Sequence, residues 1–124
     1  MRIVIDTNAL IYAAENKIDL FLLLKGNKII IPNLVLEELQ IISKAAKKAS
    51  DKKAAFLALK ILECGAFETV KLEGSTDKAI LEFAKSRDAS VLTNDLAFKK
   101  RLKQAGVKVL NIRQKKYIDG LDLN

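Results

Sequence analysis

Short apolar runs without polar alternation, separated by longer segments of helical period, constrain this chain of 124 residues more than any other feature. A strand that shows no alternation is covered on both faces, as in a parallel sheet flanked by helices. Strands are expected at residues 3–5, 28–31, 90–93 and 107–110. Residues 67–72 are a candidate for one more short strand.

The segments between these strands repeat apolar residues at the spacing of an α-helix. Helices are expected at residues 9–15, 18–25, 33–49, 52–65, 77–88 and 96–105. Residues that favour helix starts are Asn8, Pro32, Ser50 or Asp51, Ser75 or Thr76, and Asp95, and the residues expected to end helices are Gly65 and Gly106. This alternation predicts an α/β fold: one domain over residues 1–124, with a small, mainly parallel sheet and helices on both faces.

The absence of histidine excludes several kinds of catalytic site. It rules out a Ser/His/Asp triad, a Cys/His pair and a His-ligated zinc or iron, and the single cysteine rules out cysteine-rich metal sites. We expect this residue, Cys64, to pack in the core of a protein from a reducing compartment. Catalysis must therefore rest on carboxylates, hydroxyls, amides, lysines or a hard metal ion.

Hydropathy and charge indicate the cellular setting. The opening apolar run is too short for a signal peptide, and no segment approaches the roughly 18 apolar residues of a membrane span, so we expect a cytoplasmic protein without membrane contact. The formal net charge of +7 favours a polyanionic partner such as nucleic acid. The lysine clusters within residues 44–53 and 99–103 are equally consistent with solvated helix faces.

Two acidic residues follow predicted strands. Asp6 ends the first strand and Asp95 follows the third. Each alone is explained by the capping of the next helix. Because ligands of open α/β sheets bind beyond the carboxyl ends of the strands, the occurrence of both acids at one edge also indicates a site.

Two further acids are selected by helical geometry. On a wheel of residues 33–49, Glu38 falls near the middle of the apolar arc and Glu37 at its border. A glutamate directed at a core needs compensation, such as a cation or hydrogen bonds. Asp77 falls on the apolar arc of its own helix, although an acid in a first helical turn is also favoured by the helix dipole.

Convergence of Asp6, Glu38, Asp77 and Asp95 would require a counterion, because like charges repel strongly at short range. For oxygen ligands alone, Mg²⁺ or Mn²⁺ is the natural cation. Such an ion can activate a water and neutralise charge at phosphorus without any histidine. The four acids thus predict a metal-dependent phosphodiester hydrolase.

The same residues resemble the motifs of PIN domains, as found in VapC-type toxin nucleases and free-standing archaeal PIN proteins. Ile5-Asp6-Thr7-Asn8 resembles the first acidic motif, and Pro32-x-x-Val35-x-x-Glu38-Leu39 the second, which also selects Glu38 over Glu37. Asp77-x-x-Ile80 resembles the third and Val91-Leu92-Thr93-Asn94-Asp95 the fourth. The motifs occur in the family's order and cover nearly the whole chain.

This resemblance implies a three-layer PIN-like fold and a nuclease, usually acting on RNA. It implies that Asp6, Glu38, Asp77 and Asp95 are metal-coordinating catalytic acids, with Asn8 and Thr93 as polar groups supporting them. Helix capping for Asn8 and strand packing for Thr93 remain alternatives. The family also implies a homodimer and, for its toxins, inhibition by an antitoxin.

Two other functions are compatible with parts of the sequence. A haloacid-dehalogenase-like phosphatase also has an acid after its first strand, but requires a second aspartate where this chain has Asn8. A catalytically inactive nucleic-acid-binding or assembly module of the same fold would retain the acids without activity. A metal-titrated cleavage assay distinguishes this module from the nuclease.

Overall fold

The computed structural model describes residues 1–114 and 116–121 and contains one sheet of five strands. Its elements in chain order are β1 (Arg2–Ile5), α1 (Thr7–Glu15), α2 (Leu20–Leu23), β2 (Lys28–Ile30), α3 (Asn33–Ala45), α4 (Ala49–Glu63), α5 (Thr76–Arg87), β3 (Ser90–Leu92), α6 (Leu96–Gln104), β4 (Val109–Arg113) and β5 (Tyr117–Asp119).

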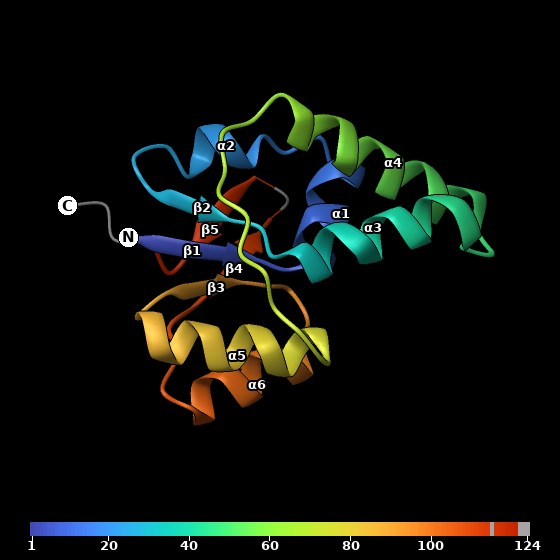
Figure 1. Cartoon of the computed structure of the whole chain (residues 1–124). Coiled ribbons are helices and arrows are strands. Elements are labelled where there is room, and N and C mark those ends of the chain that lie inside the picture. The colour runs from blue at the N-terminus through green and yellow to red at the C-terminus, as the bar shows by residue number, and fades with distance from the viewer. Residues whose placement is uncertain (115, 122–124) are drawn as a thin grey trace.

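The strands lie in the order β2-β1-β3-β4-β5, with the first four parallel and β5 antiparallel to β4. Figure 1 shows α1 to α4 on one side of this sheet and α5 and α6 on the other. Apart from Arg2, which is exposed, the residues of β1 and β3 are buried, because helices cover both faces. The predicted α/β fold with a mainly parallel sheet is confirmed.

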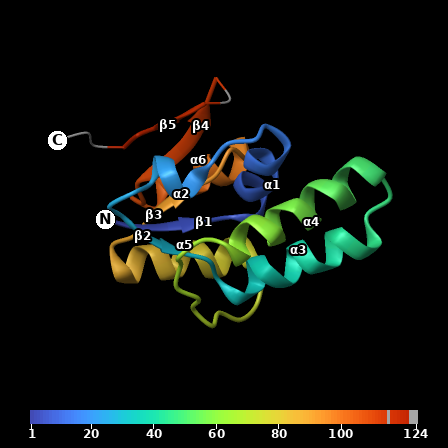
Figure 2. The same cartoon turned by 90° about the horizontal axis from the view of Figure 1, so that it is seen from above.

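Helices α3 and α4 form a hairpin that projects past the carboxyl end of β1 (Figures 1 and 2). Helix α4 packs against both α3 and α1. Its buried face consists largely of the small residues Ala54, Ala55 and Ala58, which let the helices approach closely. None of the described helices combines the length and apolar character needed to cross a membrane.

The C-terminal part of the sheet differs from the sequence prediction. The strand expected at residues 107–110 is β4, which begins at Val109 because the Val107 N–H bonds to Leu102 O in the turn after α6. Strand β5 was not predicted, since only Ile118 of its three residues is buried. Residues 67–72 form a single bridge to β2, between Ile30 and Glu68, rather than a full strand.

Several helix boundaries also differ. Helix α3 ends at Ala45, not at residue 49, because Ala46 adopts an extended conformation. Helix α4 then begins at Ala49, with Lys48 rather than Ser50 or Asp51 in the capping position. The cap of α1 is Asp6, not Asn8, whereas Pro32, Ser75 and Asp95 occupy the predicted capping positions.

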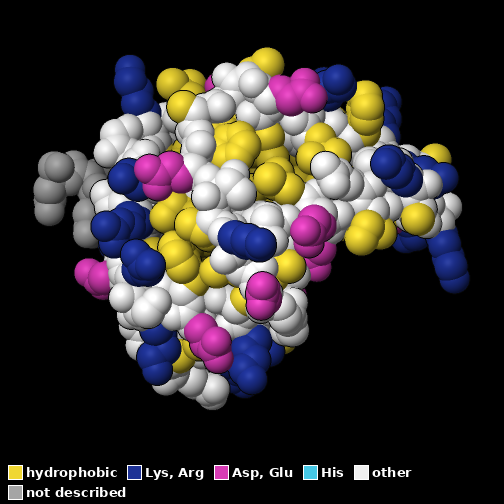
Figure 3. Space-filling model, in the orientation of Figure 1, with side chains coloured by type: hydrophobic (Ala, Val, Ile, Leu, Met, Phe, Trp, Pro, Cys, Tyr) yellow, Lys and Arg dark blue, Asp and Glu magenta, His cyan; other side chains and the backbone are white. Residues whose placement is uncertain are grey.

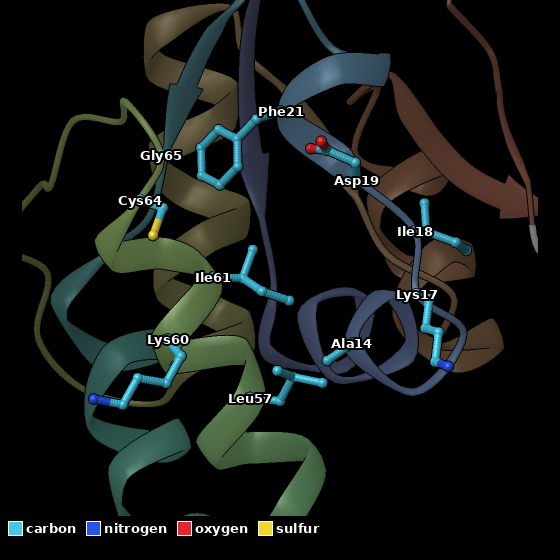
Figure 4. A pocket seen from close by; sticks show the side chains of 10 residues that line it. All are labelled: Ala14, Lys17, Ile18, Asp19, Phe21, Leu57, Lys60, Ile61, Cys64 and Gly65. Carbon is cyan, nitrogen blue, oxygen red and sulfur yellow. The ribbon is translucent and has the colours of Figure 1, made fainter.

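Gly65 and Cys64 have other roles than those expected from the sequence. Gly106 has the predicted positive φ of +80°, but Gly65 is not among the positive-φ residues. Instead, a Cβ at Gly65 would collide with the ring of Phe21 from α2, which Figure 4 shows beside it. Cys64 is exposed rather than in the core, because it lies at the end of α4 where the helix leaves the hydrophobic layer.

Candidate active site

The candidate site lies at the topological switch point of the sheet, where the helices that follow two neighbouring strands lie on opposite faces. Strands β1 and β3 are parallel neighbours, but α1 follows β1 on one face and α6 follows β3 on the other (Figure 1). The loops after the two strands therefore separate at the carboxyl edge of the sheet, which is where ligands of open α/β sheets bind. Asp6 and Asp95 follow these strands, so they lie at one edge as the sequence predicted.

Asp6 is a buried carboxylate, with only 5% of the residue exposed. One carboxylate oxygen accepts a hydrogen bond of 2.9 Å from the Ala9 N–H and so caps α1. Burial raises the pKa of Asp6 to about 6, against the lowering effect of hydrogen bonds from the Thr93 side chain and the Ala9 backbone. The negative charges of Asp77 and Asp95 raise this pKa further, so both acids are within electrostatic range of Asp6.

Thr93 connects Asp6 to Asp95. It is fully buried, and besides its bond to Asp6 its hydroxyl oxygen accepts a hydrogen bond of 3.1 Å from the Asp95 N–H. The Asp95 carboxylate, which is exposed, accepts a 3.1 Å bond from the Phe98 N–H and caps α6. Asn94 fixes the same loop by two hydrogen bonds, of 3.1 and 2.8 Å, with the backbone of Ile112 in β4.

Glu38 lies in the second turn of α3 and is half-buried, whereas Glu37 is exposed. The Thr7 hydroxyl, one residue after Asp6, donates a hydrogen bond to the Glu38 carboxylate. The relative burial of the two glutamates agrees with the predicted phase of the helix. The outer part of the predicted apolar arc does not agree, because Ile41 is exposed rather than packed.

Asp77 lies in the first turn of α5, where it is paired with a cation from another helix. The guanidinium of Arg101, on α6, donates a 2.8 Å hydrogen bond to the Asp77 carboxylate. Arg101 also lies over the ring of Phe98, 5.5 Å from its centroid. Arg101 is not predictable as a site residue from the sequence, because it stands in a lysine-rich stretch that fits a solvated basic surface.

Asn8 is exposed and bears on the acids less directly than Thr93 does. It lies with Thr7, Ile11, Glu38, Ile41 and Ile42 around a hollow of about 520 Å³ between α1 and α3. Thr7 was also missed, although it stands inside the Asp6-Thr7-Asn8 motif and its hydroxyl was the available signal. A separate hollow of about 560 Å³ between α4 and the α1–α2 segment contains none of the four acids (Figure 4).

The donors at this edge fit a hard divalent cation, because they are carboxylate and hydroxyl oxygens around a buried acid near two other negative charges. Within residues 1–114 and 116–121, however, no three acidic side chains lie close enough together to ligate one ion. Asp77 is engaged with Arg101, and Glu38 with Thr7. The structure thus gathers the acids at one edge and gives two of them protein partners.

A family model described as a PIN like domain matches residues 3–115. The chain belongs to the PIN-like domain family.

Two curated relatives of this PIN-like domain are ribonucleases by name. It is 32% identical to Ribonuclease VapC9 of Archaeoglobus fulgidus over 118 residues, which cover 93% of this chain and 85% of the relative. It is 33% identical to Ribonuclease VapC4 of Methanocaldococcus jannaschii over 129 residues, with 95% of both chains covered. The match therefore extends over nearly the whole of each protein.

Solved structures share the fold. A chain of VapBC2 from Rickettsia felis, bound to a DNA fragment from their promoter, has a TM-score of 0.62 at 26% identity, with 90% of this PIN-like domain and 98% of that chain covered. A domain of a functionally unknown protein from Methanocaldococcus jannaschii has a TM-score of 0.65 at 17% identity, with 99% of both chains covered. The second similarity concerns the fold alone.

Proposed function

We propose that this PIN-like domain, as a single unit over residues 1–124, is a metal-dependent endoribonuclease that hydrolyses RNA phosphodiester bonds. The observation that carries the proposal is the buried Asp6 carboxylate at the sheet's switch point, with Asp77 and Asp95 in electrostatic range. Burying an acid next to two like charges is unfavourable unless a cation compensates it. The ribonuclease names of the two relatives support the choice of RNA.

Asp6, Glu38, Asp77 and Asp95 are the residues that would hold Mg²⁺ or Mn²⁺. The ion would supply Lewis acidity, lowering the pKa of a water and neutralising charge on the phosphate. Asp6 contributes a fixed carboxylate, since the backbone of Ala9 and the hydroxyl of Thr93 hold it. Thr7 orients Glu38 in the same way.

Arg101 has a defined part in this proposal. Its bond to Asp77 keeps one acid neutralised while the site is free of a cation. If Asp77 held a cation, the guanidinium would be available to donate to a phosphate, for which its planar set of donors is well suited. Arg101 is thus proposed to change partner from a carboxylate of the protein to a phosphate of the substrate.

The proposed partners, besides RNA, are an antitoxin protein and a second copy of the chain. The antitoxin is suggested by the VapC names of the relatives and by the VapBC complex among the similar structures. Coexpression with the product of the neighbouring reading frame should suppress cleavage by the purified protein. Sedimentation at micromolar concentration should give the mass of a homodimer.

A cleavage assay tests the proposed activity. The purified chain is incubated with end-labelled single-stranded RNA in Mg²⁺ or Mn²⁺, and in EDTA. Cleavage is expected only with the metal and should be lost in Asp95→Asn, which retains the cap of α6 but not the charge. Asp51→Asn, which changes an exposed acid on α4, is the control and should be fully active. RNA binding without metal-dependent cleavage would instead indicate the inactive binding module.

A further inference from the structure

The hollow between α1 and α3 opens beside one of the four acids, Glu38. It is lined by Thr7, Asn8 and Ile11 from α1 and by Glu38, Ile41 and Ile42 from α3, and its volume is about 520 Å³. Thr7 and Glu38 belong at the same time to the candidate active site. A chain bound across the acids would therefore extend over this hollow.

The hollow is apolar and holds a large side chain in an unfavourable position. Ile41 is 64% exposed, although it sits on a helix whose other face packs in the core. Ile11 and Ile42 beside it are half-buried. An exposed apolar surface that adjoins a functional site is typical of a surface that binds a ligand.

The charges that follow the hollow along the chain favour a polyanion. Beyond Glu38, the chain has only basic charges until Asp51, namely Lys44, Lys47 and Lys48. Lys44 lies about 9 Å along α3 from Glu38, one turn beyond Ile41. Figure 3 shows Lys and Arg side chains gathered at the free end of the α3–α4 hairpin. Along α3, from the site toward the end of the helix, a carboxylate is therefore followed by an apolar surface and then by a cation.

We infer that the hollow binds one nucleobase of a single-stranded RNA, next to the phosphodiester at the acids. The inference rests on the proposed function and adds a base-binding subsite to it. A base presents an apolar face that Ile41 and Ile11 cover, while its backbone continues toward Lys44. Asn8 lies at the rim with an amide that both donates and accepts, so it can read the polar edge of the base.

RNA binding without cleavage tests the subsite. The affinity of the full chain in EDTA for a fluorescein-labelled single-stranded RNA is measured by anisotropy, for the intact strand and for strands with one abasic residue at each position in turn. At one position, loss of the base should weaken binding about fivefold, as expected for an apolar contact of modest area. Ile41→Ala should weaken binding of the intact strand by about the same factor.

The loss of affinity from removing the base and the loss from Ile41→Ala should not be additive. With the base missing at that position, Ile41→Ala should bind like the wild type, because the side chain and the base contact each other. The control is Leu22→Ala on α2, since Leu22 is 66% exposed and does not line the hollow. It should leave both affinities unchanged, and all variants should keep the wild-type melting temperature because these side chains are exposed.

The results that contradict the inference are specific. A flat abasic scan from a protein that cleaves RNA with Mn²⁺ would overturn the subsite and leave the proposed nuclease standing. An equal effect of Ile41→Ala on intact and abasic strands would also overturn it. If Ile41→Ala changed the sedimenting mass and not RNA binding, the hollow would belong to an interface between copies. A wild-type chain that bound no RNA would overturn both proposals.

Discussion

At the scale of single residues, Asp6 is the group whose protonation is most strongly coupled to folding. Its pKa is about 6 in the folded protein against an ordinary value of 3.8, mainly because of burial. The folded state thus binds this proton more tightly than the unfolded state does. The contribution of this proton to the free energy of unfolding is fully present below about pH 3.8 and is lost as the pH rises through about 6. The contribution lost is about 3 kcal/mol.

The substitution Asp6→Asn should remove this pH dependence. Asparagine can still accept the bond from the Ala9 N–H, but it carries no charge at neutral pH. In EDTA, the quantity compared is the free energy of unfolding of the variant minus that of the wild type. This difference should be about 2 kcal/mol larger at pH 7.5 than at pH 4. Urea unfolding at both pH values measures this difference. If the free energies of unfolding of the two proteins differed by the same amount at both pH values, the pKa of Asp6 would be close to its ordinary value.

The two adjacent glutamates of α3 give a second prediction at this scale. Glu38→Gln should lower the rate of RNA cleavage about 100-fold or more and weaken Mn²⁺ binding, because Glu38 lies at the site and is oriented by Thr7. Glu37→Gln, on the exposed side, should stay within about twofold of the wild type. Turnover and calorimetric metal titration are compared for the pair. Damage from Glu37→Gln alone would refute the assigned helix phase.

At the scale of elements, the packing of α2 on the end of α4 depends on the missing side chain of Gly65. A methyl group there would meet the ring of Phe21 (Figure 4). Gly65→Ala should therefore destabilise the protein by about 1–3 kcal/mol in urea unfolding. The exposed neighbour Ala66, changed to Ser, should have an effect within about 0.5 kcal/mol.

A double-variant cycle checks the cause of this destabilisation. Phe21→Leu removes the ring that the new methyl group would meet, so Gly65→Ala should cost less in that background. If the cost is the same with and without the ring, the effect of Gly65 is on the backbone and not on the packing of α2.

The elements that could be predicted from the sequence are those with a strong and continuous hydrophobic pattern. Strands β1 and β3 were predicted because they are buried on both faces. The end of α3 could not be, because the alanines and lysines of residues 45–49 favour a helix throughout and only the tertiary structure sets Ala46 in an extended conformation. Strand β5 depends on pairing with β4, which a pattern of three residues does not encode.

The positions of three of the acids in the fold were predictable, and their protein partners were not. Asp6 and Asp95 follow from the position of strand ends in a parallel sheet, and Glu38 from the helix wheel. The pairing of Asp77 with Arg101 joins two helices that are separate in sequence, so no local pattern marks it. Burial of Asp6 raises its pKa through the whole surrounding structure, which a sequence motif does not contain.

At the scale of the whole molecule, the net charge of +7 predicts salt-sensitive RNA binding. The structure adds that lysines gather at the free end of the α3–α4 hairpin (Figure 3). Replacing Lys44 and Lys47 by Gln should reduce the slope of log affinity against log salt concentration by about 1.4 for a single strand. Replacing Lys25, in the turn after α2, and Lys85, on α5, is the control. Equal slopes in all three proteins would show that the hairpin does not contact RNA.

The position of β1 between β2 and β3 also governs when the protein becomes complete during its synthesis. Ile3 pairs with Ser90, so the first strand to leave the ribosome has no partner on that side until most of the chain has been made. This pairing brings the ends of β1 and β3, and with them Asp6 and Asp95, to one edge of the sheet. A nascent or truncated chain that ends before β3 thus carries the first motif without a site, and any hydrolytic activity awaits release of an almost finished polypeptide.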